Sequence, residues 1–265
     1  MLDENDLKNL SVGISTIFPN LDRAKILASE IIAQASDDLL CEVVIVCQKS
    51  PSAFVDRTAA RLKIVAVTDS GLSKSRNLVL QSASGDFVWF LDDDVTVNRD
   101  VLDVIARTET TADVISGRIG CSNSQGYYKN YTRKAVAPFS LLRLSSIELI
   151  VRRKKVFEKG VRFDERLGLG AQYPCGEENA FLLDLYRRGA KFQHLNEVIV
   201  FHPCGNDGDR DYFRTPPQMF ARGIVARKFG LFFGFFLCFR WALRALKRPS
   251  SLRLVISIFR GYWHG

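Results

Sequence analysis

The chain has 265 residues, enough for one large domain or for a domain with an appendage. Hydrophobic residues make up 47% and charged residues 25%, ordinary values that exclude a mostly disordered chain. The net charge of +8 is unevenly distributed, because residues 212–265 hold ten Lys and Arg and no Asp or Glu. The same residues hold nine of the 19 Phe. Residues 1–211 then carry 27 basic and 29 acidic side chains. A near-neutral body with a basic, aromatic tail does not suggest a nucleic-acid-binding protein.

The sequence predicts a cytoplasmic protein. Its first six residues are acidic and polar, whereas a secretory signal begins with basic residues and an apolar run. The longest uncharged stretch of the tail, residues 229–239, is shorter than the ~20 residues that cross a bilayer. The six cysteines have no zinc-site spacing, and we expect them to be reduced and buried.

Strands and helices alternate along the chain. We expect strands at residues 10–18, 41–47, 62–67 and 86–91, and helices at residues 21–35 and 72–83. A helix at 101–108, strands at 112–119, 147–151 and 197–201, and a helix at 177–188 follow. Strands that are apolar on both faces indicate a parallel sheet covered by helices. Such sheets bind ligands at the carboxyl ends of their strands, so the polar residues found there are the functional candidates.

Three adjacent carboxylates follow the strand at 86–91. Asp92 and Asp94 share one side of an extended chain, and Asp93 points the other way. Two carboxylates on one side of a ligand-binding edge suit a hard divalent cation that also holds phosphate oxygens. A solvated acidic turn is the alternative, but the position directly after five apolar residues favours a functional site.

Three other sites each allow two interpretations. Glu177 and Glu178 open a helix, where they either favour the helix dipole or supply a general base. His202 ends an apolar strand and is either a third metal ligand or a packed histidine. Arg76 lies one turn into the helix after Gly71, where it reaches a phosphate or a base edge, or stays a surface arginine.

In their order along the chain, these motifs resemble the inverting family 2 glycosyltransferases. The resemblance covers residues 10–203. Its motifs are Thr16, Gly-Leu-Ser-Lys-Ser-Arg-Asn (71–77), Gly-Asp-Phe-Val-Trp-Phe-Leu-Asp-Asp-Asp (85–94), Phe-Asp-Glu (163–165), Gly-Glu-Glu (176–178) and His202. It implies a GT-A fold over residues 1–211, which is a Rossmann-like mixed α/β sheet covered by helices. A basic, Phe-rich helical tail over residues 212–265 follows.

The resemblance also implies a role for each residue. The residues expected to contact the donor nucleotide are Thr16, Gln48, Asp69, Arg76, Asp92 and Asp93. The residues expected to hold Mn²⁺ or Mg²⁺ against the diphosphate are Asp94, Asp92 and His202. Glu178, or Glu177 beside it, is expected to deprotonate the acceptor hydroxyl. Gln48 stands where relatives carry an Asp that recognises uracil, so Gln48 or Asp69 is expected to replace it, which weakens the expectation of a uridine donor.

The implied partners are a nucleotide-sugar donor, with a UDP-sugar as the first expectation, and a glycan or lipid-linked glycan acceptor of surface polysaccharide synthesis. Residues 219–246 mix apolar and basic positions. They either lie in an anionic membrane interface at the inner face of the cytoplasmic membrane or pack on the body.

Two other functions fit parts of the sequence. The segment Asp-Asp-Asp-Val-Thr (92–96) matches the Asp-x-Asp-x-Thr nucleophile motif of HAD-type phosphatases, although that motif usually lies on the first strand of its domain. A nucleic-acid-binding protein would use the basic tail. The tail's phenylalanines crowd at residues 229–239 without interleaved cations, unlike single-strand binders, so no nucleic acid is expected.

Overall fold

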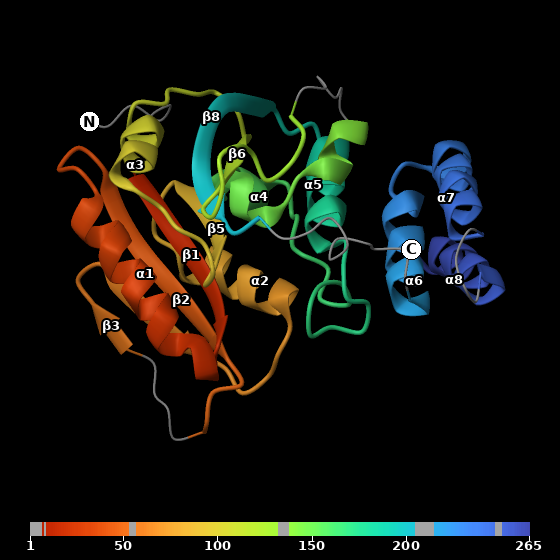
Figure 1. Cartoon of the computed structure of the whole chain (residues 1–265), viewed down its shortest axis with the longest axis horizontal. Helices are drawn as coiled ribbons and strands as arrows, with labels where there is room; N and C mark the ends of the chain where they lie inside the picture. Colours follow the sequence, from red (N-terminus) through yellow and green to blue (C-terminus); the bar gives the residue numbers. More distant parts are fainter. Residues whose placement is uncertain (1–6, 8, 53–56, 132–137, 205–214, 247–250) are drawn as a thin grey trace.

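A mixed sheet runs through the body of the molecule (Figure 1). The computed structural model describes residues 7, 9–52, 57–131, 138–204, 215–246 and 251–265, and in them the sheet has eight strands in the order β3-β4-β2-β1-β5-β7-β6-β8. The strands are β1 (Asn9–Ile17), β2 (Leu40–Gln48), β3 (Arg57–Ala59), β4 (Leu62–Ala66), β5 (Phe87–Asp92), β6 (Val114–Cys121), β7 (Leu149–Arg152) and β8 (Phe192–His202).

Strand direction divides this sheet. Strands β4, β2, β1 and β5 run parallel, as do β6 and β8. The edge strand β3 and the inserted strand β7 run antiparallel to their neighbours. The expectation of a parallel sheet from the apolar strands is therefore wrong for β7, because apolar periodicity reports burial and not strand direction. The mixed sheet of the GT-A fold is confirmed.

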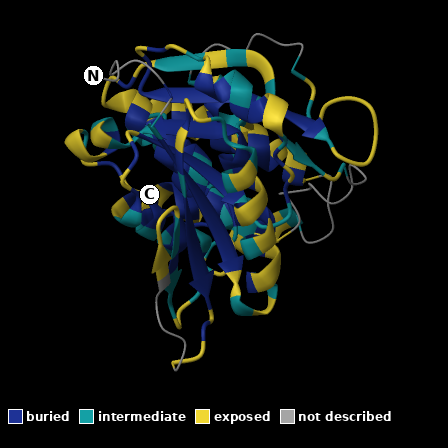
Figure 2. Cartoon of the chain, turned by 90° about the vertical axis from the view of Figure 1, so that its left-hand side faces the viewer, coloured by how far each residue is buried: buried dark blue, intermediate teal, exposed yellow. Residues whose placement is uncertain are grey.

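Helices cover both faces of the sheet. The face under α1 (Leu21–Gln34) and α3 (Arg99–Ala106) receives Phe87, Trp89 and Leu91. Val88 and Phe90 point to the other face, under α2 (Leu72–Ser82), α4 (Arg153–Glu158) and α5 (Glu177–Arg187). Alternate residues of one strand thus enter two cores. The strands β1, β2, β5, β6 and β7 are correspondingly buried along most of their length, with exposed residues on the outer helices (Figure 2).

The tail forms three helices beside α5 (Figure 1): α6 (Pro216–Arg227), α7 (Leu231–Ala245) and α8 (Ser251–His264). They share a core of their own around Trp241 and Tyr262. One face of α6 also enters the core under α5 through Ile224 and Val225. The tail therefore packs on the body. No helix among the described residues is long and apolar enough to cross a membrane. The boundary expected between residues 211 and 212 lies outside the described residues, so this division stays a prediction.

The six cysteines do not all match the expectation of reduced thiols. Cys121 at the end of β6 and Cys204 after β8 form a disulfide, with Cα atoms 5.3 Å apart. The pairing arises because β6 and β8 are parallel neighbours whose ends meet, although the two cysteines are 83 positions apart in sequence. The other four cysteines are free and buried, as expected.

The strand register brings the polar candidates to one edge of the sheet. Asp92 pairs with Ser15, the neighbour of Thr16, and Gln48 pairs with Ile17. At the other side of this edge, Thr96 and Phe201 exchange two backbone hydrogen bonds of 2.8 and 2.9 Å. That bridge fixes the end of β8 beside the loop after β5.

Candidate active site

A cavity of about 510 Å³ opens between this sheet edge and the start of α5. Five of the predicted site residues line it: Arg76, Asp92, Glu177, Glu178 and His202. They come from α2, β5, α5 and β8. The cavity therefore unites the predicted base with part of the carboxylate motif, and it extends to α6 through Arg222 and Val225.

Arg76 lies at the centre of the site, with a side chain that is only 3% exposed. Its Nη1 donates to Glu177 Oε1 at 3.0 Å, and its Nη2 donates to Asp92 Oδ1 at 3.4 Å and to Ser146 Oγ at 2.6 Å. The buried cation thus balances two carboxylates that come from distant parts of the chain. This arrangement makes Arg76 a positioning residue, and its expected contact with the nucleotide base stays a prediction.

The turn before α5 determines the positions of Glu177 and Glu178. Gly176 has a φ of +87°, a left-handed conformation that favours glycine, and a Cβ there would lie 3.0 Å from Val225. Burial and the neighbouring charge of Glu177 raise the pKa of Glu178 to about 8. A carboxylate with a pKa near neutral pH is suited to take a proton from a hydroxyl.

The three aspartates point to three different partners. Burial raises the pKa of Asp92 despite the opposing charge of Arg76. Thr16 donates a hydrogen bond to Asp93, and Arg23 approaches the same carboxylate at 3.9 Å. Asp94 Oδ2 lies 3.5 Å from His202 Nε2. The hydrogen bond between them lowers the pKa of Asp94 and raises that of His202.

The chemistry of the pair formed by Asp94 and His202 suits a divalent cation. Carboxylate oxygens are ligands that Mg²⁺ and Mn²⁺ prefer, and neutral imidazole also binds divalent metals. Within the described ranges no group of three His, Cys, Asp or Glu side chains is placed to hold a metal. The pair therefore fits a cation that takes its remaining ligands from donor phosphates and water.

Gln48 and Asp69 line a second pocket, of about 410 Å³, at the start of α2. Gln48 Oε1 accepts a hydrogen bond of 2.7 Å from the backbone N–H of Gly71, so the amide is held in place at the pocket wall. Thr16 does not line this pocket. Four of the predicted nucleotide contacts are thus divided between two hollows of the same sheet edge, with Gln48 and Asp69 in one and Arg76 and Asp92 in the other, whereas Thr16 and Asp93 line neither.

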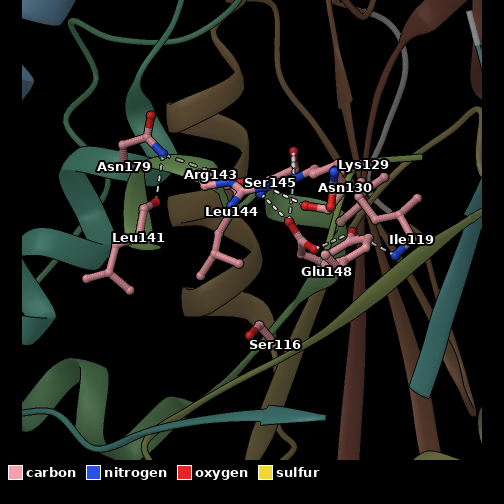
Figure 3. A network of polar contacts seen from close by, with 12 residues as sticks. Ser116, Ile119, Lys129, Asn130, Leu141, Arg143, Leu144, Ser145, Glu148 and Asn179 are labelled. Atoms are coloured by element: carbon pink, nitrogen blue, oxygen red, sulfur yellow. Dashed lines mark hydrogen bonds and ion pairs between the residues drawn. The ribbon is translucent and has the colours of Figure 1, made fainter. Parts of the chain in front are cut away.

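Sequence reasoning missed the segment that supports Arg76. Glu148 is fully buried and accepts hydrogen bonds from Lys129, Tyr131 and the backbone of Ser145, as Figure 3 shows for Lys129 and Ser145. This network fixes the turn that presents Ser146 to Arg76. The only signal in the sequence was the cluster of tyrosines in the polar stretch 120–140.

Comparisons with known proteins identify the family of the chain. The family model described as Glycosyl transferase family 2 matches residues 23–175. The poly(ribitol-phosphate) beta-N-acetylglucosaminyltransferase TarS of Staphylococcus aureus is 22% identical over 157 residues, which are 58% of this chain and 27% of TarS. The chain thus spans about a quarter of the length of that curated relative.

Solved structures of S. aureus TarS share the fold. The crystal structure of TarS residues 1–349 has a TM-score of 0.59 and 18% identity, covering 97% of this chain and 72% of that one. The complex of the same fragment with UDP-GlcNAc has a TM-score of 0.61 and 20% identity, covering 83% and 66%. These matches give no support to a phosphatase or to a nucleic-acid-binding protein. Since the family model covers more than half of its residues, the chain belongs to glycosyl transferase family 2.

Proposed function

We propose that this chain transfers a sugar from a nucleotide-diphosphate donor, a UDP-sugar in the first instance, to an acceptor hydroxyl with inversion at the anomeric carbon. The observation that carries the proposal is the single cavity that holds Asp92, Glu178 and His202 around Arg76. The TarS complexes with UDP-GlcNAc and UDP support a uridine donor by analogy.

In the proposed reaction, Glu178 takes the proton of the acceptor hydroxyl. The acceptor oxygen then forms a bond to the anomeric carbon while the bond from that carbon to the diphosphate oxygen breaks, so that the nucleoside diphosphate leaves with the electron pair. Arg76 holds Glu177 and Asp92 in place, which fixes the start of α5 relative to the sheet edge. Glu178 therefore takes the proton from a fixed position at the start of a helix.

Asp94 and His202 would hold Mn²⁺ or Mg²⁺ in this proposal. When bound, such an ion stabilises the negative charge that develops on the departing diphosphate. Asp92 accepts a hydrogen bond from Arg76 and lies beside the pair formed by Asp94 and His202. In this proposal Asp92 therefore orients the donor next to the metal site.

The proposed acceptor is a glycan or lipid-linked glycan of surface polysaccharide synthesis, reached at a membrane surface. A stripe of α7 exposes apolar side chains at helical spacing, among them Phe232 (85% exposed), Phe236 (67%) and Leu243 (50%). Such a stripe, with arginines beside it, suits the interface of an anionic bilayer. The replacement of Phe232 and Phe236 by serine should reduce sedimentation with anionic liposomes, and equal sedimentation would contradict a membrane role.

The test of the catalytic proposal is a panel of nucleotide sugars with Mn²⁺ or Mg²⁺, read out as nucleotide release. Proton NMR of the freshly released or transferred sugar gives its anomeric configuration. We expect one donor to be consumed with inversion. Glu158→Gln, which changes an exposed carboxylate on α4, is the control and should behave as the unmodified chain. Retention of configuration, or no turnover of any nucleotide sugar, would contradict the proposal.

A further inference from the structure

A third hollow, a groove of about 540 Å³, lies where the tail meets the body. Four arginines line it: Arg143 from the body, Arg222 from α6, and Arg240 and Arg244 from α7. Trp241 forms part of its floor, and the guanidinium of Arg222 lies over that ring at 5.1 Å. The groove thus combines concentrated positive charge with an apolar, aromatic surface.

The groove adjoins the catalytic cavity. Leu142, Arg143 and Arg222 line both hollows, so an occupant of the groove can extend to Glu178. The turn that carries Arg143 is fixed, because its guanidinium donates to the carbonyl of Asn130, and Lys129 next to Asn130 is tied to Glu148 (Figure 3). This wall of the groove is therefore built before any ligand arrives.

Two of the four groove arginines are not balanced by carboxylates of the described residues. Arg240 and Arg244 make no ion pair with any residue in the described part of the chain, and residues 212–265 contain no Asp or Glu at all. Arg240 and Arg244 lie one helical turn apart, and the repulsion between two such like charges is relieved when an anion binds beside them. Arginine is also the side chain best shaped for bidentate contacts with phosphate.

The helical position of the two α7 arginines supports a specific site. Leu237, Arg240, Trp241 and Arg244 follow one another at spacings of three, one and three residues, which place them on one face of α7, and all four line the groove. The exposed phenylalanines Phe232 and Phe236 do not line it. The helix therefore presents its basic face to the groove and a different, apolar face to the surroundings.

We propose that this groove binds a phosphate or diphosphate group of the acceptor and thereby presents an acceptor hydroxyl to Glu178. This inference rests on the proposed sugar transfer and adds to it the chemical class of the acceptor. The phosphate belongs either to a water-soluble polyol phosphodiester or to a lipid-linked diphosphate. Both offer the same anionic oxygens to the arginines.

The test compares two variants that remove the same charge from the tail. Arg240→Ala with Arg244→Ala empties the groove of two cations, whereas Arg253→Ala with Arg260→Ala removes two exposed cations of α8 that do not line it. Calorimetric titration of the full chain with pyrophosphate in EDTA should show affinity at least about tenfold weaker for the first pair only, since each lost charge-assisted hydrogen bond has a large effect. Equal affinity in both variants, or equal weakening, would overturn the proposal.

Two further titrations distinguish the sources of the phosphate. A soluble polyol phosphodiester oligomer and an isoprenyl diphosphate in detergent micelles replace pyrophosphate, and the one that also accelerates nucleotide release is the acceptor type. Its KM should rise at least about tenfold in the groove variant while kcat and donor KM stay unchanged. An unchanged acceptor KM would overturn the proposal. A chain that binds pyrophosphate in the groove but turns over no nucleotide sugar would instead contradict the proposed sugar transfer.

Discussion

The body and the tail use the same residue types in opposite ways. In the body, Phe87 and Phe90 are almost fully buried on the two faces of β5. In the tail, Phe232 and Phe236 are mostly exposed, although they stand on a helix with a core of its own. The body's central arginine is buried between carboxylates, whereas Arg240 and Arg244 line an open groove.

This difference separates residues that hold the fold from residues placed for contact. Large exposed apolar patches are uncommon on monomeric proteins and usually mark interaction sites. The body, in our proposals, positions a base and a metal-binding pair by internal contacts. The tail, in our proposals, positions the acceptor and the membrane surface. Each prediction below changes one of these regions and compares it with the other.

The largest difference should appear in the stability of two phenylalanine variants. Phe90 packs edge-on against Phe163, with ring centroids 5.3 Å apart. Phe90→Ala should lower the free energy of unfolding by about 3–5 kcal/mol because it leaves a cavity in the core. Phe232→Ala should change it by less than about 0.5 kcal/mol, since that ring is 85% exposed. Urea denaturation measures both, and similar losses would contradict the comparison.

Removal of the buried cation should destabilise the body by a comparable amount. Arg76→Met leaves the carboxylate of Glu177 buried without its partner, which costs about 3–5 kcal/mol. A second change, Glu177→Gln, should restore part of that loss because it removes the uncompensated charge. Arg187→Met, at an exposed position of α5, is the matched control. A double variant no more stable than Arg76→Met would show that the pair does not act as we describe.

A smaller, more selective effect is expected at Asp94. Asp94→Asn should weaken metal-dependent donor binding at least about tenfold, since it removes an anionic oxygen from the proposed metal pair. Glu178→Gln should leave that binding unchanged, because Glu178 belongs to the acceptor side. Calorimetric titration of the donor with and without Mn²⁺ checks this, and equal losses in both variants would contradict the division of roles.

The effect of pH on kcat/KM should be as large as the effect of Asp94→Asn on donor binding, or smaller. The pKa of Glu178 is raised to about 8, so the carboxylate form needed to accept a proton becomes populated as the pH rises through that value. At saturating metal, kcat/KM should therefore increase about tenfold between pH 7 and pH 9 and then level off. A rate that is flat or falls over this interval would mean that another group is the base.

The sequence was informative where chemistry is local. The strand at 86–91 was predicted within one residue, because apolar residues on both faces allow few other structures. The place of Asp92 and His202 at one edge followed from the rule for strand ends, whereas Glu178 entered the predicted site through the family resemblance. The antiparallel direction of β7 was not predictable, since it depends on how the chain returns from the polar segment before it.

The features that the sequence did not predict are mainly contacts between residues far apart in the chain. The contact between Arg76 and Glu177 joins residues 101 positions apart, and the disulfide joins residues 83 apart. No local pattern encodes either. The groove lined by Arg143 and Arg240 was missed for the same reason, because its walls come from the body and the tail. The basic tail could be recognised from composition. Composition did not show which of its charged residues face the body.

The most direct test of the account measures donor binding and nucleotide release side by side for the unmodified chain and Glu178→Gln. Glutamine has the same shape but cannot take a proton. We predict that the donor binds equally well to both, and that transfer falls by about 10²–10⁴-fold in the variant. Full activity in Glu178→Gln would contradict the central claim that this carboxylate activates the acceptor.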